Sequence, residues 1–167
     1  APCDKDIQVK AGAGTGKTTC IWYFIEKIGL ELDVVLFVSY MGKAVSAMIR
    51  HGLPAKTLHA TCYTYEKEVE YDEKGRMIIL DNGKPKMRWV QHLKKKLPKK
   101  IKLIVVDEGF TIPEQNALDL LSFGLPIVVL GDSNQLPPPF GKPYFLKYPD
   151  VELKQIMRQA EGNPIIY

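Results

Sequence analysis

A glycine-rich segment near the start of the chain, AGAGTGKT at 11–18, has the residue types and spacing that bind phosphate groups. Its glycines let the backbone turn tightly, so that successive N–H groups point at one centre. Lys17 can reach the β- and γ-phosphates of a nucleotide, and the Thr18 hydroxyl can coordinate Mg²⁺. The segment therefore predicts a site for ATP and Mg²⁺, with nucleotide contacts from Gly12, Ala13, Gly14, Thr15, Gly16, Lys17, Thr18 and Thr19.

Two adjacent carboxylates follow an apolar run in LIVVDEG at 103–109. Four apolar residues predict a buried strand that ends at the carboxyl edge of a sheet, where open α/β sheets bind their ligands. Asp107 is expected to hold Mg²⁺, and Glu108 is expected to polarise the attacking water as a general base. Together with the glycine-rich segment, this pair predicts nucleotide hydrolysis rather than binding alone.

Two more side chains could sense the γ-phosphate. Gln135 lies three residues after Asp132 in VVLGDSNQLPPP, and its neutral amide can bond the phosphate or the attacking water. Arg158 lies near the end of the chain, and a guanidinium that reaches the γ-phosphate would stabilise charge in the transition state. Lys17, Glu108, Gln135 and Arg158 are thus the candidate catalytic residues.

Strand and helix patterns alternate along the chain, which predicts an α/β fold with a mainly parallel, doubly wound sheet and helices on both faces. Apolar, β-branched runs indicate strands, whereas helical spacing of apolar residues followed by glycine indicates helices. The expected strands are 6–10, 33–39, 102–108 and 126–132, and the expected helices follow 16 and span 42–52 and 113–124.

Residues 66–90 interrupt this alternation and contain two turn signals, Lys74-Gly75 and Asn82-Gly83. We expect a small antiparallel hairpin or meander inserted before the strand that carries Asp107. The aromatic residues Tyr65, Tyr71 and Trp89 are expected to pack this insertion onto the sheet, with base stacking as the alternative.

The 167 residues form a single predicted domain, 1–167, with a net charge of +4 and a sequence pI near 8.9. Six lysines lie between Lys94 and Lys102. They are interpreted as a solvated helix end and loop, with phosphate contact as the alternative. No apolar run approaches the roughly 20 residues needed to cross a bilayer, so no membrane partner is expected. Three cysteines without metal-binding spacing indicate reduced thiols in an intracellular protein.

The motif order resembles superfamily 1 DNA helicases of the RecD-like branch, of bacterial and phage type. Its elements here are AGAGTGKTT, SYMGKAVSAM, AKTLHATCY, LIVVDEG, GDSNQLPP and LKQIMRQAEGNPII. The resemblance implies a RecA-like P-loop NTPase domain, the N-terminal motor lobe of a cytoplasmic helicase, with the second RecA-like lobe absent after Tyr167. It also implies ATP-driven movement on single-stranded DNA or at a duplex fork, in the 5′ to 3′ direction. The implied DNA contacts are Ser39, Tyr40, Lys43, Thr57 and His59.

Two other functions remain open at this point. PhoH-like ATPases also combine a P-loop, an Asp-Glu pair and a Gly-Asp segment followed by glutamine, but they lack a counterpart of IMRQAEGNPII. A non-catalytic nucleotide-binding or DNA-binding module is the other alternative, although Glu108 has no role in simple binding. If the domain is one lobe of a two-lobed motor, residues 1–167 alone are expected to bind nucleotide weakly and not to unwind DNA.

Overall fold

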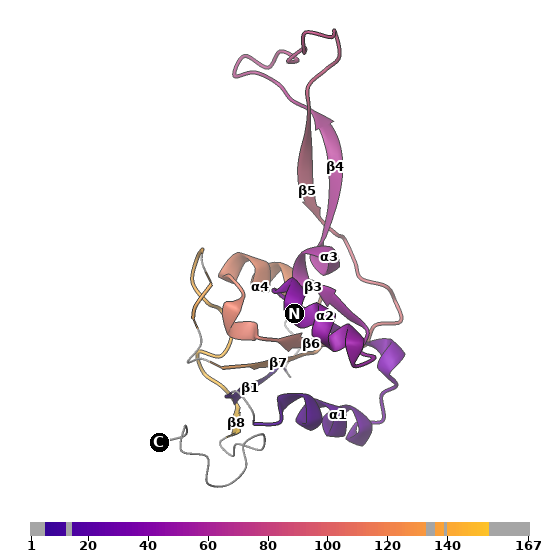
Figure 1. Ribbon diagram of the computed structural model, residues 1–167, viewed down its shortest axis with the longest axis vertical. Helices are drawn as coiled ribbons and strands as arrows, with labels where there is room; N and C mark the ends of the chain where they lie inside the picture. The colour runs from indigo at the N-terminus through magenta and orange to yellow at the C-terminus, as the bar shows by residue number, and fades with distance from the viewer. Residues whose placement is uncertain (1–5, 13–14, 133–135, 139, 154–167) are drawn as a thin grey trace.

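A parallel sheet forms the body of the computed structural model, and a long hairpin projects from it (Figure 1). The structure describes residues 6–12, 15–132, 136–138 and 140–153. The elements in chain order are β1 (Ile7–Ala11), α1 (Lys17–Lys27), η1 (Leu32–Val34), β2 (Val35–Ser39), α2 (Gly42–Arg50), β3 (Ala55–Thr57), α3 (Leu58–Cys62), β4 (Tyr63–Val69), β5 (Met87–Leu93), β6 (Leu103–Asp107), η2 (Gly109–Thr111), α4 (Glu114–Leu121), β7 (Ile127–Gly131) and β8 (Val151–Leu153).

The main sheet has six strands in the order β3-β2-β6-β7-β1-β8, and every neighbouring pair is parallel. The central strands β2 and β7 are buried along their whole length, as expected for β-branched runs covered on both faces. The predicted α/β fold with a mainly parallel sheet is therefore confirmed.

Helices cover both faces of this sheet, because successive residues of each strand point to opposite sides. On one face, Phe37 and Val105 belong to a core that also contains Ile21 and Ile25 of α1. On the other face, Leu36, Val38, Ile104 and Val106 share a core with Leu58 of α3 and with Ala117 and Leu120 of α4. In Figure 1 the sheet lies between α1 and α4, which is the predicted doubly wound arrangement.

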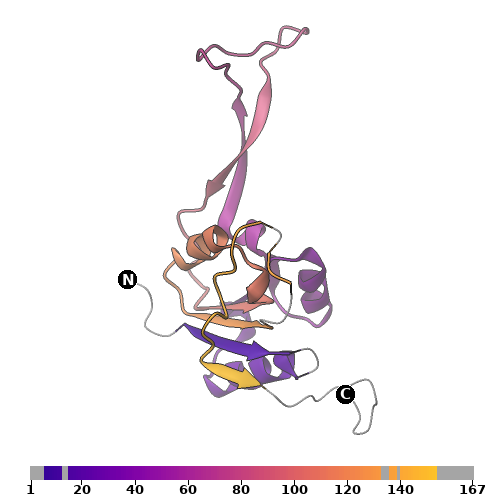
Figure 2. The ribbon, with the colours of Figure 1, turned by 90° about the vertical axis from the view of Figure 1, so that its left-hand side faces the viewer.

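Two strands of the sheet, β3 and β8, were not predicted. Each is only three residues long and lies at an outer edge, where burial on both faces is not needed and no apolar run marks it. Figure 2 shows β8 beside β1 at one edge of the sheet. The lysine-rich segment also differs from expectation, since residues 94–102 follow strand β5 and contain no helix.

The predicted insertion is an antiparallel hairpin, somewhat longer than 66–90. Strands β4 and β5 pair from Tyr63 opposite Leu93 to Val69 opposite Met87. Both predicted turns are present, and Gly75 and Gly83 each adopt a φ of 74°, which favours glycine. Figures 1 and 2 show the hairpin standing well away from the sheet.

The aromatic residues of the hairpin do not pack against the sheet, so that expectation is wrong. Trp89 is 66% exposed and Tyr71 is 57% exposed. The Lys67 ammonium lies 5.0 Å from the centre of the Trp89 ring, an exposed cation–π contact within the hairpin. Because the hairpin projects outward, these rings have no core to enter.

The base of the hairpin is fixed to helix α4 by a hydrogen-bonded tyrosine. The buried Tyr63 hydroxyl donates to Asp119 Oδ2 at 2.5 Å and accepts from Asn116 Nδ2 at 2.8 Å. Burial, followed by the neighbouring Asp119 carboxylate, raises the pKa of Tyr63, so the phenol stays protonated and able to donate. This contact fixes the start of β4 relative to the motif-bearing sheet.

Candidate functional site

The carboxyl ends of the central strands bring the predicted motifs to one edge of the sheet. Strand β1 ends at Ala11, and helix α1 begins at Lys17 after the glycine-rich turn. Gly16 adopts a φ of 81°, the left-handed conformation that lets the turn enter the helix. Asp107 ends β6 opposite Ser39 of β2. Strand–turn–helix is the context that phosphate-binding loops require.

An ion pair joins the glycine-rich segment to the acidic pair. Lys17 Nζ lies 3.0 Å from Glu108 Oε1, and the two side chains are only 15% and 24% exposed. A half-buried ammonium needs a partner, and here the carboxylate supplies it. The two motifs, far apart in sequence, therefore meet in the fold.

Glu108 is held in an unusual backbone conformation. Its φ of 54° and ψ of 44° are left-handed, which is uncommon for a residue with a Cβ atom. The turn is locked because the Thr111 backbone N–H and hydroxyl both donate to the Glu108 carbonyl, at 3.0 and 2.7 Å. Such strain is stored where surrounding contacts over-determine a residue, commonly at functional sites.

The second carboxylate oxygen of Glu108, Oε2, is buried and has no hydrogen-bond partner among the residues that the structure describes. A buried acceptor of this kind is costly unless a donor reaches it. A water molecule that donates to this oxygen would be polarised for attack on a phosphate. The acceptor thus has the chemistry expected of a general base for hydrolysis.

Asp107 lies next to this pair at the carboxyl end of β6. Burial, and then the adjacent Glu108 charge, raise the pKa of the Asp107 carboxyl, while Lys17 and the Glu108 backbone N–H act in the opposite direction. A bound cation would offset the burial and the repulsion. Within the described part of the chain, no three His, Cys, Asp or Glu side chains are grouped to hold a metal. A metal ion at Asp107 would therefore need further ligands, such as the phosphates of a nucleotide.

We expect Asp107→Asn to stabilise the chain at neutral pH while impairing metal binding. The folded state holds the Asp107 proton to higher pH than the unfolded state does, so stability falls as pH rises from the ordinary value of 3.8 through the raised pKa. Asparagine removes the free-energy cost of burying the ionised Asp107 carboxylate next to Glu108. The melting temperature at pH 7 should rise by a few degrees, and the difference should shrink below about pH 4.

Thermal unfolding monitored by fluorescence measures this effect across pH. Asp81→Asn is the matched control, since Asp81 is exposed at the tip of the hairpin and should leave the melting temperature unchanged. A lower melting temperature for Asp107→Asn at pH 7 would mean that the hydrogen bond from the Glu108 N–H, 3.0 Å long, outweighs burial.

Two glycines allow the acidic pair to approach β7 closely. A Cβ atom at Gly109 would lie 2.2 Å from Val129 Cγ1, and one at Gly131 would lie 2.7 Å from Leu146 Cδ1. The backbone of η2 therefore packs directly on β7, where a larger residue than glycine does not fit. Gly131 belongs to the GDSNQLPP motif at the end of a predicted strand, but the sequence pattern did not reveal the close packing at Gly131 or Gly109.

Several predicted site residues cannot be placed in this geometry. Ala13, Gly14, Gln135 and Arg158 lie outside the described residues. For Thr18 and Thr19 the structure describes only the backbone, which is helical at the start of α1. Their roles stay predictions.

The candidate DNA contacts share the same sheet edge, but two of them have structural roles. Ser39 is fully buried and its hydroxyl accepts from the Met41 N–H at 3.4 Å, so it shapes the turn and is not a surface contact. Thr57 caps helix α3, since its hydroxyl accepts from the Ala60 N–H at 3.1 Å.

Tyr40, Lys43 and His59 are, like Thr57, at least partly exposed. Tyr40 and His59 are half-buried with ring centroids 5.4 Å apart, and the His59 ring lies 5.8 Å from that of Tyr63. This row of rings leads from the carboxyl end of β2 to the base of the hairpin, and the sequence pattern did not reveal it. Lys43 is exposed in the first turn of α2.

None of the helices in the described ranges is sufficiently long and apolar to cross a bilayer. No curated protein matches the chain. Among solved structures, Bacteroides Pif1 bound to ssDNA matches with a TM-score of 0.58 and 22% identity. The match covers 95% of this chain but only 40% of the Pif1 chain, and it shows a shared fold.

A family model described as "AAA domain" matches residues 3–141. This stretch contains the glycine-rich segment, the acidic pair and the Gly131-Asp132 pair. It covers most of the sequence and includes the ion pair between Lys17 and Glu108. The chain therefore belongs to the AAA domain family.

Proposed function

We propose that this chain is an ATP-hydrolysing motor domain that moves along single-stranded DNA. The observation that carries the proposal is the 3.0 Å contact between Lys17 and Glu108, which unites the phosphate-binding segment with the acidic pair. A phosphate-binding turn alone would support binding only. A glutamate with a buried acceptor oxygen beside it adds the group that hydrolysis needs.

Each residue of the site has a separate role in ATP binding and hydrolysis in this proposal. Lys17 exchanges its contact with Glu108 for the β- and γ-phosphates, and the freed carboxylate orients the attacking water. Thr18 and Asp107 hold Mg²⁺, which supplies positive charge against the phosphates when bound. Gln135 and Arg158 remain the proposed γ-phosphate contacts.

The DNA part of the proposal has separate support. The fold is shared with Bacteroides Pif1, a protein crystallised with ssDNA. In this chain Tyr40, Lys43 and His59 lie near the carboxyl ends of β2 and β3, the edge that also carries Asp107. The exposed rings of the hairpin favour base stacking over core packing, at single-stranded DNA or a duplex fork. Movement in the 5′ to 3′ direction, as in RecD-like helicases of bacteria and phages, and a cytoplasmic location belong to the same proposal.

The motor requires a second lobe in this proposal. The chain spans about 40% of the length of the Pif1 chain that it matches. A second RecA-like domain of the same protein would close over the nucleotide and grip DNA from the other side. Residues 1–167 alone are therefore expected to bind nucleotide weakly and not to unwind duplex DNA.

The experiment is a titration of the 167-residue chain with a fluorescent ATP analogue in the presence and absence of Mg²⁺. Saturable, Mg²⁺-dependent binding is expected. Lys17→Met should weaken it by about tenfold or more, because the phosphates lose their contact with the ammonium group of Lys17. Lys27→Met is the matched control, since Lys27 is exposed in the last turn of α1. Equal binding by all three proteins would remove Lys17 from the site and contradict the proposal.

A further inference from the structure

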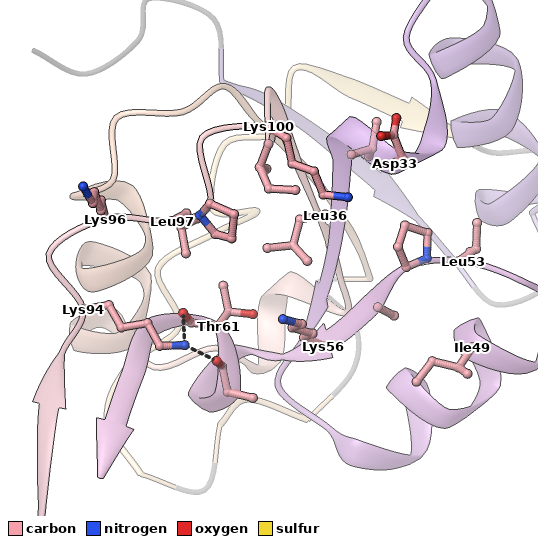
Figure 3. A pocket seen from close by; sticks show the side chains of 16 residues that line it. Asp33, Leu36, Ile49, Leu53, Lys56, Thr61, Lys94, Lys96, Leu97 and Lys100 are labelled. Atoms are coloured by element: carbon pink, nitrogen blue, oxygen red, sulfur yellow. Dashed lines mark hydrogen bonds between the residues drawn. The ribbon is translucent and has the colours of Figure 1, made fainter. Parts of the chain in front are cut away.

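A cavity lies away from the nucleotide edge of the sheet, and the proposed function does not use it. Its volume is about 860 Å³. It opens between β3 and α2 on one side and the segment after β5 on the other (Figure 3). The lining residues are Asp33, Val35, Leu36, Ile49, Leu53, Pro54, Ala55, Lys56, Ala60, Thr61, Lys94, Lys96, Leu97, Pro98, Lys100 and Ile101.

The position of the cavity separates it from the ATP site. Val35 begins β2, Ala55 begins β3, and Ile101 comes just before β6. The cavity is therefore at the amino ends of these strands, whereas Asp107 and Glu108 lie at or just beyond the carboxyl end of β6. A ligand here would not compete with nucleotide.

The floor of the cavity is apolar and its margin is cationic. Val35, Leu36 and Leu53 are buried and form part of the floor. Four lysines line the cavity against a single aspartate, Asp33. Figure 3 shows Lys56, Lys100 and Leu36 among the side chains that line the cavity, with Lys94 at one end. An apolar centre with a charged rim is the pattern of protein interaction sites.

The lysine at the end of the cavity is held in place by the fold. Lys94 Nζ donates to the carbonyl oxygens of Ala60 at 2.6 Å and Thr61 at 3.1 Å. These carbonyls belong to the last turn of α3 and have no partner within so short a helix. These two hydrogen bonds connect the segment after the hairpin to α3 at this end of the cavity.

The chemistry of the lining argues against a nucleic acid. Among the described residues that line the cavity, none is aromatic and none is arginine. Bases bind through stacking on such side chains. The cavity instead offers aliphatic surface with ammonium groups at its margin, which suits aliphatic or aromatic side chains that alternate with carboxylates.

We propose that this cavity docks an acidic peptide segment of a partner protein, with apolar side chains on Leu36 and Leu53 and carboxylates facing Lys56 and Lys100. The volume lies within the range of about 300–1,000 Å³ found for ligand pockets, enough for a few side chains but not for a folded domain. The excess of lysines selects an acidic segment over a neutral one.

The test measures fluorescence anisotropy of a short fluorescein-labelled peptide, built from aspartate, leucine and phenylalanine, on titration with the 167-residue chain. The double variant Lys56→Glu/Lys100→Glu should weaken binding by about tenfold or more, because like charges then face each other. Lys95→Glu/Lys99→Glu is the matched control. It makes the same total change of charge, with both substitutions in the segment that contains Lys100, but neither residue lines the cavity, so it should change affinity less than about twofold.

Two further probes sharpen the outcome. Lys100→Ala alone should also lower the affinity for the peptide. A peptide with asparagine in place of aspartate should bind more weakly than the acidic one. Equal loss in both double variants would show unspecific attraction to lysines and overturn the proposal. Tighter binding of oligothymidylate than of the peptide, with loss in Lys56→Glu/Lys100→Glu, would assign the cavity to nucleic acid and also overturn it.

Discussion

Glu108→Gln should retain ATP binding and lose hydrolysis. Glutamine keeps the shape of the side chain but cannot accept a proton from water, and general-base catalysis contributes roughly 10²–10⁴-fold to a rate. The ion pair with Lys17 adds a second expectation. In the wild type, the phosphates must compete with a carboxylate for the Lys17 ammonium, whereas in the variant they compete with a neutral amide. Nucleotide affinity should therefore stay equal or increase.

The measurement combines the fluorescent nucleotide titration with release of phosphate from radiolabelled ATP under single-turnover conditions. Glu114→Gln is the control, because Glu114 is an exposed residue in the first turn of α4 and undergoes the same change of charge. Unchanged turnover in Glu108→Gln would remove this residue from catalysis and favour a non-catalytic nucleotide-binding module. Lost nucleotide binding would instead indicate that Glu108 supports the phosphate site structurally.

The fold was largely predictable because its central strands carry their own signal. The runs at 35–39, 103–107 and 127–131 are almost wholly apolar, since both faces of each strand are covered. The outer strands β3 and β8 have no such signal, because a three-residue edge strand owes its existence to the neighbouring strand and not to its own composition.

Site residues could be predicted where the order of elements along the chain sets their position. They could not be predicted where their conformation or burial depends on contacts with segments distant in sequence. Strand–turn–helix order places Lys17, and the end of an apolar strand places Asp107, so both could be anticipated. The left-handed conformation of Glu108 depends on how closely η2 packs on β7, which no local pattern records. Ser39 similarly resembled a DNA contact, but its burial follows from its neighbours.

The role of the lysine-rich segment at 94–102 also depends on contacts that its composition does not show. Six lysines between Lys94 and Lys102 suggest only a solvated surface when read along the chain. The fold brings Lys94, Lys96 and Lys100 to a cavity floored by side chains from β2 and β3. Three lysines in the same run do not line the cavity, and all three are exposed as expected for a solvated surface: Lys95, Lys99 and Lys102. Proximity in space, and not composition, separates the two groups.

Gly109→Ala should be the most destabilising small substitution near the site. The added Cβ would lie 2.2 Å from Val129 Cγ1 and 3.5 Å from the Leu130 carbonyl oxygen. Val129 is fully buried and β-branched, so it cannot rotate away without a clash elsewhere. Overpacking of this kind costs about 3 kcal/mol. The free energy of unfolding, measured by urea denaturation, should fall by that amount.

Gly42→Ala provides the control, because a Cβ at this position in the first turn of α2 meets nothing within 4 Å. Its stability should be unchanged or slightly increased, since alanine favours helix over glycine by up to about 1 kcal/mol. Val129→Ala supplies a second check by removing the clashing methyl group. In a double-mutant cycle, Gly109→Ala and Val129→Ala together should cost on the order of 1–2 kcal/mol less than the sum of their separate effects. Strictly additive costs would show that η2 has room to move off β7, and that the close approach does not hold Glu108 in its left-handed conformation.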